Sequence, residues 1–170
     1  GSIVLSPDGS VYDELPYFKE ELRFYQLEDV IKGGYDREQP KEKISLIHDA
    51  LIMGLQDYFG KLGLKKAILG LSGGIDSAVT AVMATRALGK ENVRVVLMPS
   101  AYSSSHSVDD AKALAENLGI HYDLIPIVAP YDAFNTLLTE VMEGKPFDVT
   151  EENIQARCRA IILMAISNKH

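Results

Sequence analysis

The sequence has 170 residues, 46% hydrophobic and 24% charged, which is enough for one domain with a real core. Its formal net charge of −7 argues against a nucleic-acid partner or an anionic membrane surface, but not against a small anion site. No apolar run reaches the roughly 18 residues that span a bilayer, and the first residues lack a signal-peptide pattern. The single cysteine, Cys158, excludes an internal disulfide and suits a cytoplasmic location.

The first forty residues differ from the rest in composition. Residues 1–40 hold nine acidic and four basic side chains, so most of the net negative charge lies there. Pro7-Asp8-Gly9 is a typical turn sequence between two short β-prone pieces. Residues 32–40 have the composition of a linker that ends at Pro40. We expect this segment to be separate from a domain over residues 41–170.

From Lys41 onward, helical and strand patterns alternate along the chain. Helices are expected over residues 42–63, 76–88, 107–119, 129–144 and 150–168. Short buried strands are expected over residues 66–71, 92–99 and 120–127. Ser107 and Thr150 are the expected helix caps, and Gly89 and Gly119 the expected stops.

This alternation predicts an α/β fold with a parallel sheet flanked by helices. Parallel strands need crossover connections of about a dozen residues or more, and the expected helices supply them. Such sheets bind ligands at the carboxyl ends of their strands. The glycine-serine loop that follows the first expected strand therefore falls at the ligand-binding edge. A strand, a loop of small residues and a helix N-terminus together favour an anion site.

Four known types of loop or cap fit this stretch less well. A Walker A loop requires a lysine after the glycines, and a dinucleotide fingerprint requires a spacing that Gly70 and Gly73 do not have. The stretch from Gly70 to Gly74 matches the nucleophile elbow of hydrolases, but no later histidine is well placed for a triad. A plain helix cap by Asp76 would leave the paired glycines and Ser72 unused.

Residues 72–77 read Ser-Gly-Gly-Ile-Asp-Ser, which resembles the S-G-G-x-D-S loop of the N-type ATP pyrophosphatases at every defined position. The resemblance implies the adenine nucleotide alpha-hydrolase-like fold, with ATP and Mg²⁺ at this loop. The implied ATP-binding residues are Gly70, Leu71, Ser72, Gly73, Gly74, Ile75, Asp76 and Ser77. The glycines would allow phosphate to approach the backbone, and Ser72 and Asp76 are the expected catalytic residues. Asp76 is also the expected metal ligand, because a carboxylate beside phosphates needs a cation between them.

Residues 97–120 and 147–169 resemble the NAD synthetases, particularly the synthetase half of the glutamine-dependent kind. In that family a Glu-Asn-x-Gln-Ala-Arg segment begins a helix that contacts deamido-NAD, sometimes across a dimer interface. Asn153 and Arg157 match this segment, and their spacing of four places them on one helical face. An amide and a guanidinium suit a carboxylate and phosphates. Arg159, two residues further on, is expected to point elsewhere.

The same resemblance implies a ligase that converts deamido-NAD to NAD through an NAD-adenylate, releasing pyrophosphate and then AMP. Ammonia would come from glutamine through a glutaminase domain that is not in this chain. Residues 1–40 look like the last part of that nitrilase-like half and its linker, and Cys158 matches nothing in its chemistry. A homo-oligomer, dimer or higher, is also implied.

Further strands of the synthetase domain have no counterpart in this sequence. We therefore expect residues 41–170 to be the N-terminal part of that domain, with a sheet incomplete at its C-terminus and no turnover alone. Two alternatives stay open. One is another amidating or thiolating ATP pyrophosphatase, such as a GMP-synthetase-like domain. The other is an ATP-binding module without turnover.

Overall fold

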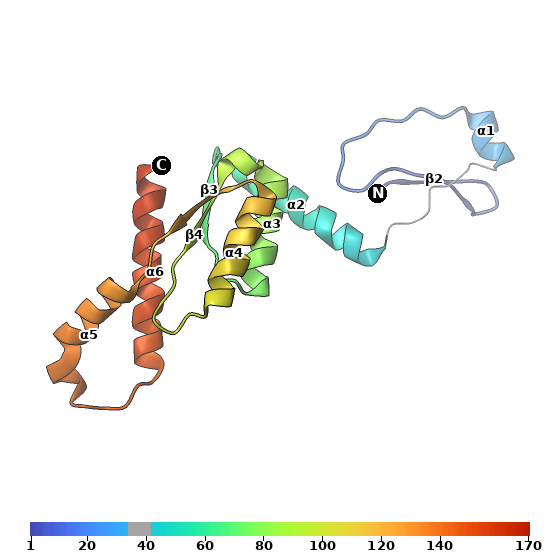
Figure 1. Cartoon of the computed structure of the whole chain (residues 1–170). Helices are drawn as coiled ribbons and strands as arrows, with labels where there is room; N and C mark the ends of the chain where they lie inside the picture. The colour runs from blue at the N-terminus through green and yellow to red at the C-terminus, as the bar shows by residue number, and fades with distance from the viewer. Residues whose placement is uncertain (34–41) are drawn as a thin grey trace. The chain divides into compact units, whose positions relative to one another are not determined.

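A computed structural model of the chain describes residues 1–33 and 42–170 (Figure 1). The chain divides into two compact units, Gly1–Gly54 and Leu55–His170, with the division inside the long helix α2 (Lys43–Leu62). Most of the expected linker, residues 34–40, lies outside the described residues. No helix of the described residues is both long and apolar enough to cross a membrane.

The first unit contains a short antiparallel hairpin, β1 (Ile3–Leu5) and β2 (Val11–Glu14), followed by the helix α1 (Leu27–Lys32). Its turn is the expected one, with the Gly9 amide donating to the Ser6 carbonyl at 2.9 Å and Gly9 at a φ of 83°. Asp13 of β2 is buried. Burial alone would raise the pKa of its carboxyl, but hydrogen bonds from Tyr25 and Arg23 hold that pKa below its ordinary value.

The second unit is built on a three-stranded parallel sheet, which confirms the expected fold class. Its strands are β3 (Ala67–Gly70), β4 (Val93–Leu97) and β5 (His121–Leu124), in the order β3-β4-β5. The pairs β3–β4 and β4–β5 are both parallel. A single 3₁₀ turn (Lys90–Asn92) leads into β4. All three strands therefore end at the same edge, where the loop after β3 lies.

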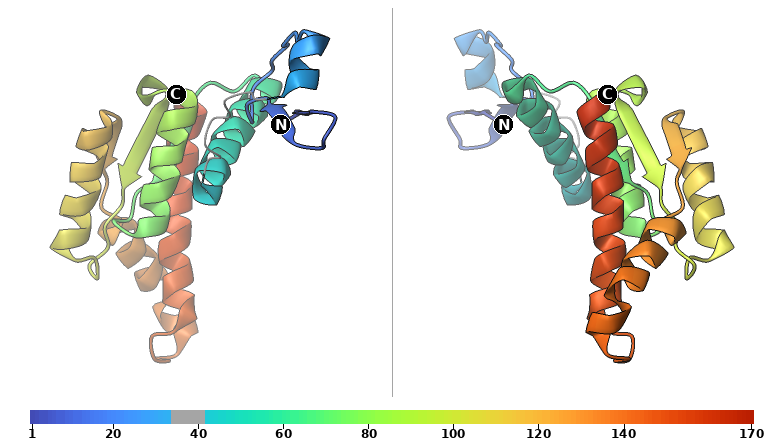
Figure 2. Two further views of the ribbon diagram at one scale, coloured as in Figure 1. Left: turned by 90° about the vertical axis from the view of Figure 1, so that its right-hand side faces the viewer. Right: turned by 90° about the vertical axis from the view of Figure 1, so that its left-hand side faces the viewer.

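Helices cover both faces of this sheet (Figure 2). The central strand alternates, so that Val93, Val95 and Leu97 face one layer while Val96 faces the other. On the first side, α3 (Ile75–Leu88) and α4 (Ser105–Leu118) contribute small residues, which let helix and sheet pack closely. These are Ala81, Ala84, Ala111 and Ala115.

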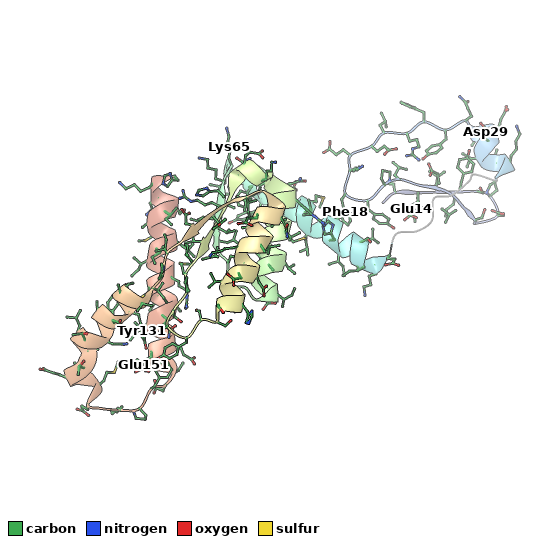
Figure 3. The ribbon with its side chains drawn as sticks, in the orientation of Figure 1. Glu14, Phe18, Asp29, Lys65, Tyr131 and Glu151 are labelled. Atoms are coloured by element: carbon green, nitrogen blue, oxygen red, sulfur yellow. The ribbon has the colours of Figure 1, made fainter. Side chains whose placement is uncertain are left out.

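The other face packs against α6 (Val149–Lys169), the longest helix of the second unit. Cys158 is 3% exposed there, in a cluster with Val96, Met98 and Ile127. The helix α5 (Val128–Met142) precedes α6 and buries Tyr131 (Figure 3). The lone cysteine is thus a core residue.

Two helix caps differ from the expectation. The helix α4 begins at Ser105 rather than Ser107, because the Ser104 side chain accepts from the Ser107 amide and so caps an earlier turn. Likewise α6 is capped by Asp148, not by Thr150. Asp148 accepts from the Thr150 amide at 2.7 Å. In each case an equally good capping residue stands two or three positions earlier in the sequence.

The helical pattern of residues 42–63 is also confirmed, as α2, but its apolar face does not pack as such a pattern usually does. None of the residues of α2 is buried, and Ile44 is 67% exposed. The periodicity therefore predicted the helix correctly, but no side chain of its apolar face is fully buried.

Candidate nucleotide site

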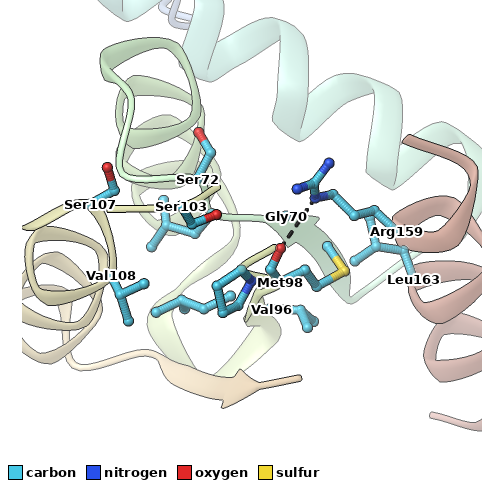
Figure 4. Close-up of a pocket in the computed structure, with 12 residues that line it drawn as sticks. Gly70, Ser72, Val96, Met98, Ser103, Ser107, Val108, Arg159 and Leu163 are labelled. Carbon is cyan, nitrogen blue, oxygen red and sulfur yellow. Dashed lines mark hydrogen bonds between the residues drawn. The ribbon is translucent and has the colours of Figure 1, made fainter. Parts of the chain in front are cut away.

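A pocket of about 230 Å³ opens at the carboxyl ends of β3 and β4 (Figure 4). This is the edge where parallel sheets bind ligands. Its walls are mostly apolar, with serines on one side and one arginine on the other. The lining residues are Gly70, Leu71, Ser72, Val96, Leu97, Met98, Pro99, Ser103, Ser107, Val108, Arg159 and Leu163. Three of the expected nucleotide residues, Gly70 to Ser72, therefore line it.

The loop after β3 is held in shape by its own serines. The Ser77 hydroxyl donates to the Gly74 carbonyl at 2.9 Å and lies 3.0 Å from the Ser72 hydroxyl. The Ser72 amide in turn donates to the Ser77 hydroxyl at 3.2 Å. At its start the loop continues the sheet, because the Leu71 amide donates to the Val96 carbonyl at 3.0 Å. Both serines thus hold the loop in shape, and Ser72 remains exposed.

The two glycines of the loop have different structural roles. Gly73 has a φ of +82°, and a Cβ there would lie 2.3 Å from the carbonyl oxygen of Ser107. Gly73 is therefore required by the backbone of α4, whether or not a phosphate approaches it. Gly74 has an ordinary φ of −85°, and its nearest atom to a built Cβ is the Ser72 hydroxyl oxygen at 3.4 Å. Of these two glycines, only Gly74 has no structural need to be glycine, so only Gly74 is a candidate for a position where a ligand requires the absence of a side chain.

The N-terminus of α3 is available to an anion. Gly74 is its N-cap, and no side chain caps the helix. The hypothesis that Asp76 serves as the helix cap is therefore wrong. The first amides of such a helix carry partial positive charge and lack partners within the helix. Asp76 lies in the first turn and is exposed beside them.

Asp76 suits Mg²⁺ only in combination with a substrate. The described residues contain no group of three His, Cys, Asp or Glu side chains that could hold a metal ion. Mg²⁺, however, is commonly bound by one or two carboxylates together with the phosphates of a nucleotide. A single exposed carboxylate beside an anion-binding loop fits that kind of site.

The structure places Asn153 and Arg157 together, as expected, but not at the pocket. The Arg157 guanidinium donates to the Asn153 side-chain oxygen at 2.8 Å, so the two share one exposed face of α6. Neither residue lines the pocket. The predicted common face is confirmed, and their contact with deamido-NAD stays a prediction.

Arg159 lines the pocket, although the sequence patterns did not assign it to the site. Arg159 was expected to point away from the face of Asn153 and Arg157, and this is confirmed. Its side chain extends over Gly70 into the pocket (Figure 4). Its Nε donates to the Met98 carbonyl at 3.2 Å. The Arg-x-Arg spacing was the available signal, since two residues on a helix are about 200° apart. One of the two had to face the sheet.

The loop after β4 also reaches the pocket, through Ser103. The Ser100 amide donates to the Ser103 hydroxyl at 2.9 Å, which holds this side chain toward the site. Tyr102 is 71% exposed and makes an edge contact with Phe147, with ring centroids 5.9 Å apart. Of the serines in this loop, Ser103 lines the pocket while Ser104 caps α4.

Comparison with known proteins relates most of the chain to a single family. The family model described as NAD synthase matches residues 47–170. The glutamine-dependent NAD(+) synthetase of Rhodobacter capsulatus is 48% identical over 99% of this chain, which corresponds to 31% of that protein. The enzyme of the same name from Thermotoga maritima is 54% identical over 71% of this chain and 21% of its own length.

Solved structures give the same relation. The glutamine-dependent NAD+ synthetase from Acinetobacter baumannii, solved in complex with ADP, has a TM-score of 0.76 and 40% identity. That match covers 79% of this chain and 25% of the other. The NH3-dependent NAD synthetase from Campylobacter jejuni has a TM-score of 0.66 and 32% identity, over 75% and 53% of the two chains. The chain thus spans under a third of the curated relatives named above.

Proposed function

This chain belongs to the NAD synthase family, and we propose that it supplies the ATP-binding part of an enzyme that amidates deamido-NAD to NAD. The observation that carries the proposal is the uncapped N-terminus of α3 behind an open Gly74, beside the pocket at the end of β3. Such a terminus attracts phosphate, because its amides point outward and its dipole favours negative charge.

In the proposed reaction, the carboxylate of deamido-NAD attacks the α-phosphorus of ATP and pyrophosphate leaves. Ammonia then attacks the acyl carbon, and AMP leaves with the bonding electron pair. In this chain the loop would hold the departing pyrophosphate at the amides of α3. The exposed Ser72 hydroxyl would donate to a phosphate oxygen. These residues would bind and orient the phosphates and stabilise their negative charge. Positioning and charge stabilisation account for a large part of the catalysis of phosphoryl transfer.

Asp76 would hold Mg²⁺ against the phosphates, where the ion offsets their negative charge. Its exposure and its place in the first turn of α3 support this role. Without the cation, its carboxylate would repel ATP. Asp76 therefore has opposite effects on ATP affinity in the presence and absence of Mg²⁺.

Asn153 and Arg157 would contact deamido-NAD from the outer face of α6. Their exposure and their absence from the pocket support a site completed by a second copy of the protein, as a homo-oligomer would provide. In the same proposal residues 1–40 are the end of a preceding glutaminase half. The alignment over 99% of the chain supports this, since the family model begins only at residue 47. We place the whole protein in the cytoplasm.

Titration of the 170-residue chain with ATP in Mg²⁺, followed by calorimetry, tests the proposal. The wild type should bind ATP, and Gly74→Ala should bind it about tenfold or more weakly, because a methyl group would hold a phosphate off the amides. The fold has room for that methyl group. The matched control is Gly54→Ala in α2, where a Cβ meets no atom within 4 Å.

Gly54→Ala should leave the ATP affinity unchanged. The proposal is wrong if the wild type does not bind ATP, or if Gly74→Ala binds it as tightly as the wild type does. Thermal unfolding of both variants shows whether any loss comes from the fold instead of the site.

A further inference from the structure

The geometry points to Arg159 as the residue that binds the phosphate next to the nucleoside, so that this pocket distinguishes a nucleotide from a nucleoside. This inference rests on the proposed function, and it adds a residue on α6 to a site so far built from the ends of β3 and β4. It starts from the one charged side chain that lines the pocket.

Arg159 is positioned but not neutralised. Its Nε donates to the Met98 carbonyl at 3.2 Å, a neutral acceptor, which fixes the direction of the side chain. It forms no ion pair with any carboxylate in residues 1–33 and 42–170. Two arginines elsewhere are paired with a carboxylate, which raises the pKa of each guanidinium: Arg23 with Asp13, and Arg94 with Asp123. A half-buried guanidinium with free donors is a natural partner for an anion.

The size and polarity of the pocket indicate which part of a nucleotide enters it. Its volume of about 230 Å³ is below the roughly 300–1,000 Å³ usual for whole small ligands. The inner wall is apolar, formed by Val96, Leu97, Met98 and Val108. Phosphates would lose their hydration there without compensation, whereas a flat base would not. The pocket therefore suits the base, with the phosphates outside it.

Arg159 lies where the base would give way to the phosphates. Its side chain extends from α6 over Gly70, with Ser72, Ser103 and Ser107 across the pocket (Figure 4). The uncapped N-terminus of α3 begins at Gly74, two residues after Ser72 of the pocket wall. In this proposal the base fills the pocket, and the first phosphate lies at its mouth between Arg159 and the loop, with the later phosphates at that terminus. The phosphate in contact with Arg159 is then the α-phosphate, the group that is attacked and that leaves with AMP.

The test compares AMP with adenosine on the 170-residue chain by calorimetry, in EDTA to remove any contribution of Mg²⁺ at Asp76. AMP carries only the α-phosphate, so its advantage over adenosine measures that phosphate alone. The wild type should bind AMP about tenfold to a hundredfold more tightly than adenosine, as expected for charge-assisted hydrogen bonds. Arg159→Gln should abolish that advantage while leaving adenosine affinity unchanged.

Two further variants separate charge from shape. Arg159→Lys keeps the charge without the two-pronged donor, so it should retain part of the advantage. Lys65→Gln removes the same charge from an exposed position just before β3, at the opposite edge of the sheet (Figure 3). It should behave as wild type. Added salt should weaken AMP binding by the wild type more than by Arg159→Gln.

The inference is overturned if Arg159→Gln weakens AMP and adenosine by the same factor, since Arg159 would then only shape the pocket through Met98. It is also overturned if both affinities stay unchanged. If Gly74→Ala weakens ATP binding while Arg159→Gln leaves AMP binding intact, the inference fails and the proposed function stands. If the wild type binds neither ATP nor AMP, both fail together.

Discussion

Gly73 and Gly74 look equivalent in the sequence, but the structure gives them different reasons to be glycine. Gly73 has a φ of +82°, and a Cβ on it would collide with the backbone of Ser107. Gly74 has ordinary backbone geometry, and a Cβ on it would make an ordinary contact of 3.4 Å with the Ser72 hydroxyl oxygen. The expectation that both glycines serve the approach of phosphate is therefore incomplete. A loss of ATP binding on substituting Gly73 would not by itself report a contact with ligand.

Gly73→Ala should destabilise the chain. A side chain in the left-handed region costs about 1–2 kcal/mol, and the contact of 2.3 Å with the Ser107 carbonyl oxygen adds to that. Thermal or urea unfolding beside Gly74→Ala measures the effect, and Gly74→Ala should unfold close to wild type. Equal stability of the two variants would contradict the packing of α4 against this loop.

Asp76→Asn should affect ATP binding in opposite directions with and without Mg²⁺. In Mg²⁺ the affinity should fall about tenfold or more, because the ligand charge is lost. In EDTA it should stay equal or rise, because a repulsive carboxylate is removed.

Stability should change by less than about 1 kcal/mol, the range for one charge in a first helical turn. Glu28→Gln, which removes a first-turn carboxylate from α1, is the matched control and should leave both affinities unchanged. A loss of affinity in Asp76→Asn that is equal in Mg²⁺ and in EDTA would show that Asp76 does not hold the ion.

At the scale of elements, the caps of α4 and α6 set where two site-bearing helices begin. Ser104 starts α4 early enough to bring Ser107 against Gly73 and Val108 into the pocket wall. Asp148 starts α6 with a capping box, in which Glu151 accepts from the Asp148 amide at 2.8 Å. Each cap thus helps to fix the position of a pocket wall.

Asp148→Ala should lower the melting temperature at pH 7, and Asp148→Asn, which keeps an acceptor, should lower it less. The hydrogen bond from the Thr150 amide holds the pKa of Asp148 below its ordinary value of 3.8. A lowered folded pKa means that the ionised group stabilises the fold above pH 3.8 and loses that contribution as pH falls through the folded pKa.

The difference in melting temperature between wild type and Asp148→Ala should therefore shrink below about pH 4. Melting curves recorded between pH 2 and 7 measure it. A difference that does not depend on pH would mean that the carboxylate charge plays no part in this cap.

At the scale of the whole molecule, the chain matches only part of the length of its relatives. It spans 31% of the Rhodobacter capsulatus enzyme and contains the loop, Asp76 and the α6 face, while the rest of such an enzyme has no counterpart in this sequence. Binding and turnover are therefore separate properties for this chain. Binding of ATP needs the end of a sheet and one helix terminus, whereas turnover needs every group that contacts the transition state.

The 170-residue chain should bind ATP but should not make NAD in multiple turnovers. Losing one transition-state contact typically costs about a hundredfold or more in rate, and most of the length of the relatives has no counterpart in this chain. Incubation with ATP, Mg²⁺, deamido-NAD and either ammonia or glutamine, with NAD and pyrophosphate followed over time, measures this. Repeated turnover with ammonia would show that the residues present suffice. Repeated turnover with glutamine would mean that residues 1–40 retain an amidase function.

The sequence by itself determined the alternating strands and helices, the parallel sheet and the serine-glycine loop at its ligand-binding edge. Periodicity and turn chemistry act over a few residues, so these features can be read locally. It did not determine why Gly73 is glycine or that Arg159 faces the pocket. Both depend on contacts between distant segments, residue 73 with 107 and residue 159 with 98. Only the packing of α4 and α6 on opposite faces of the sheet brings those atoms together.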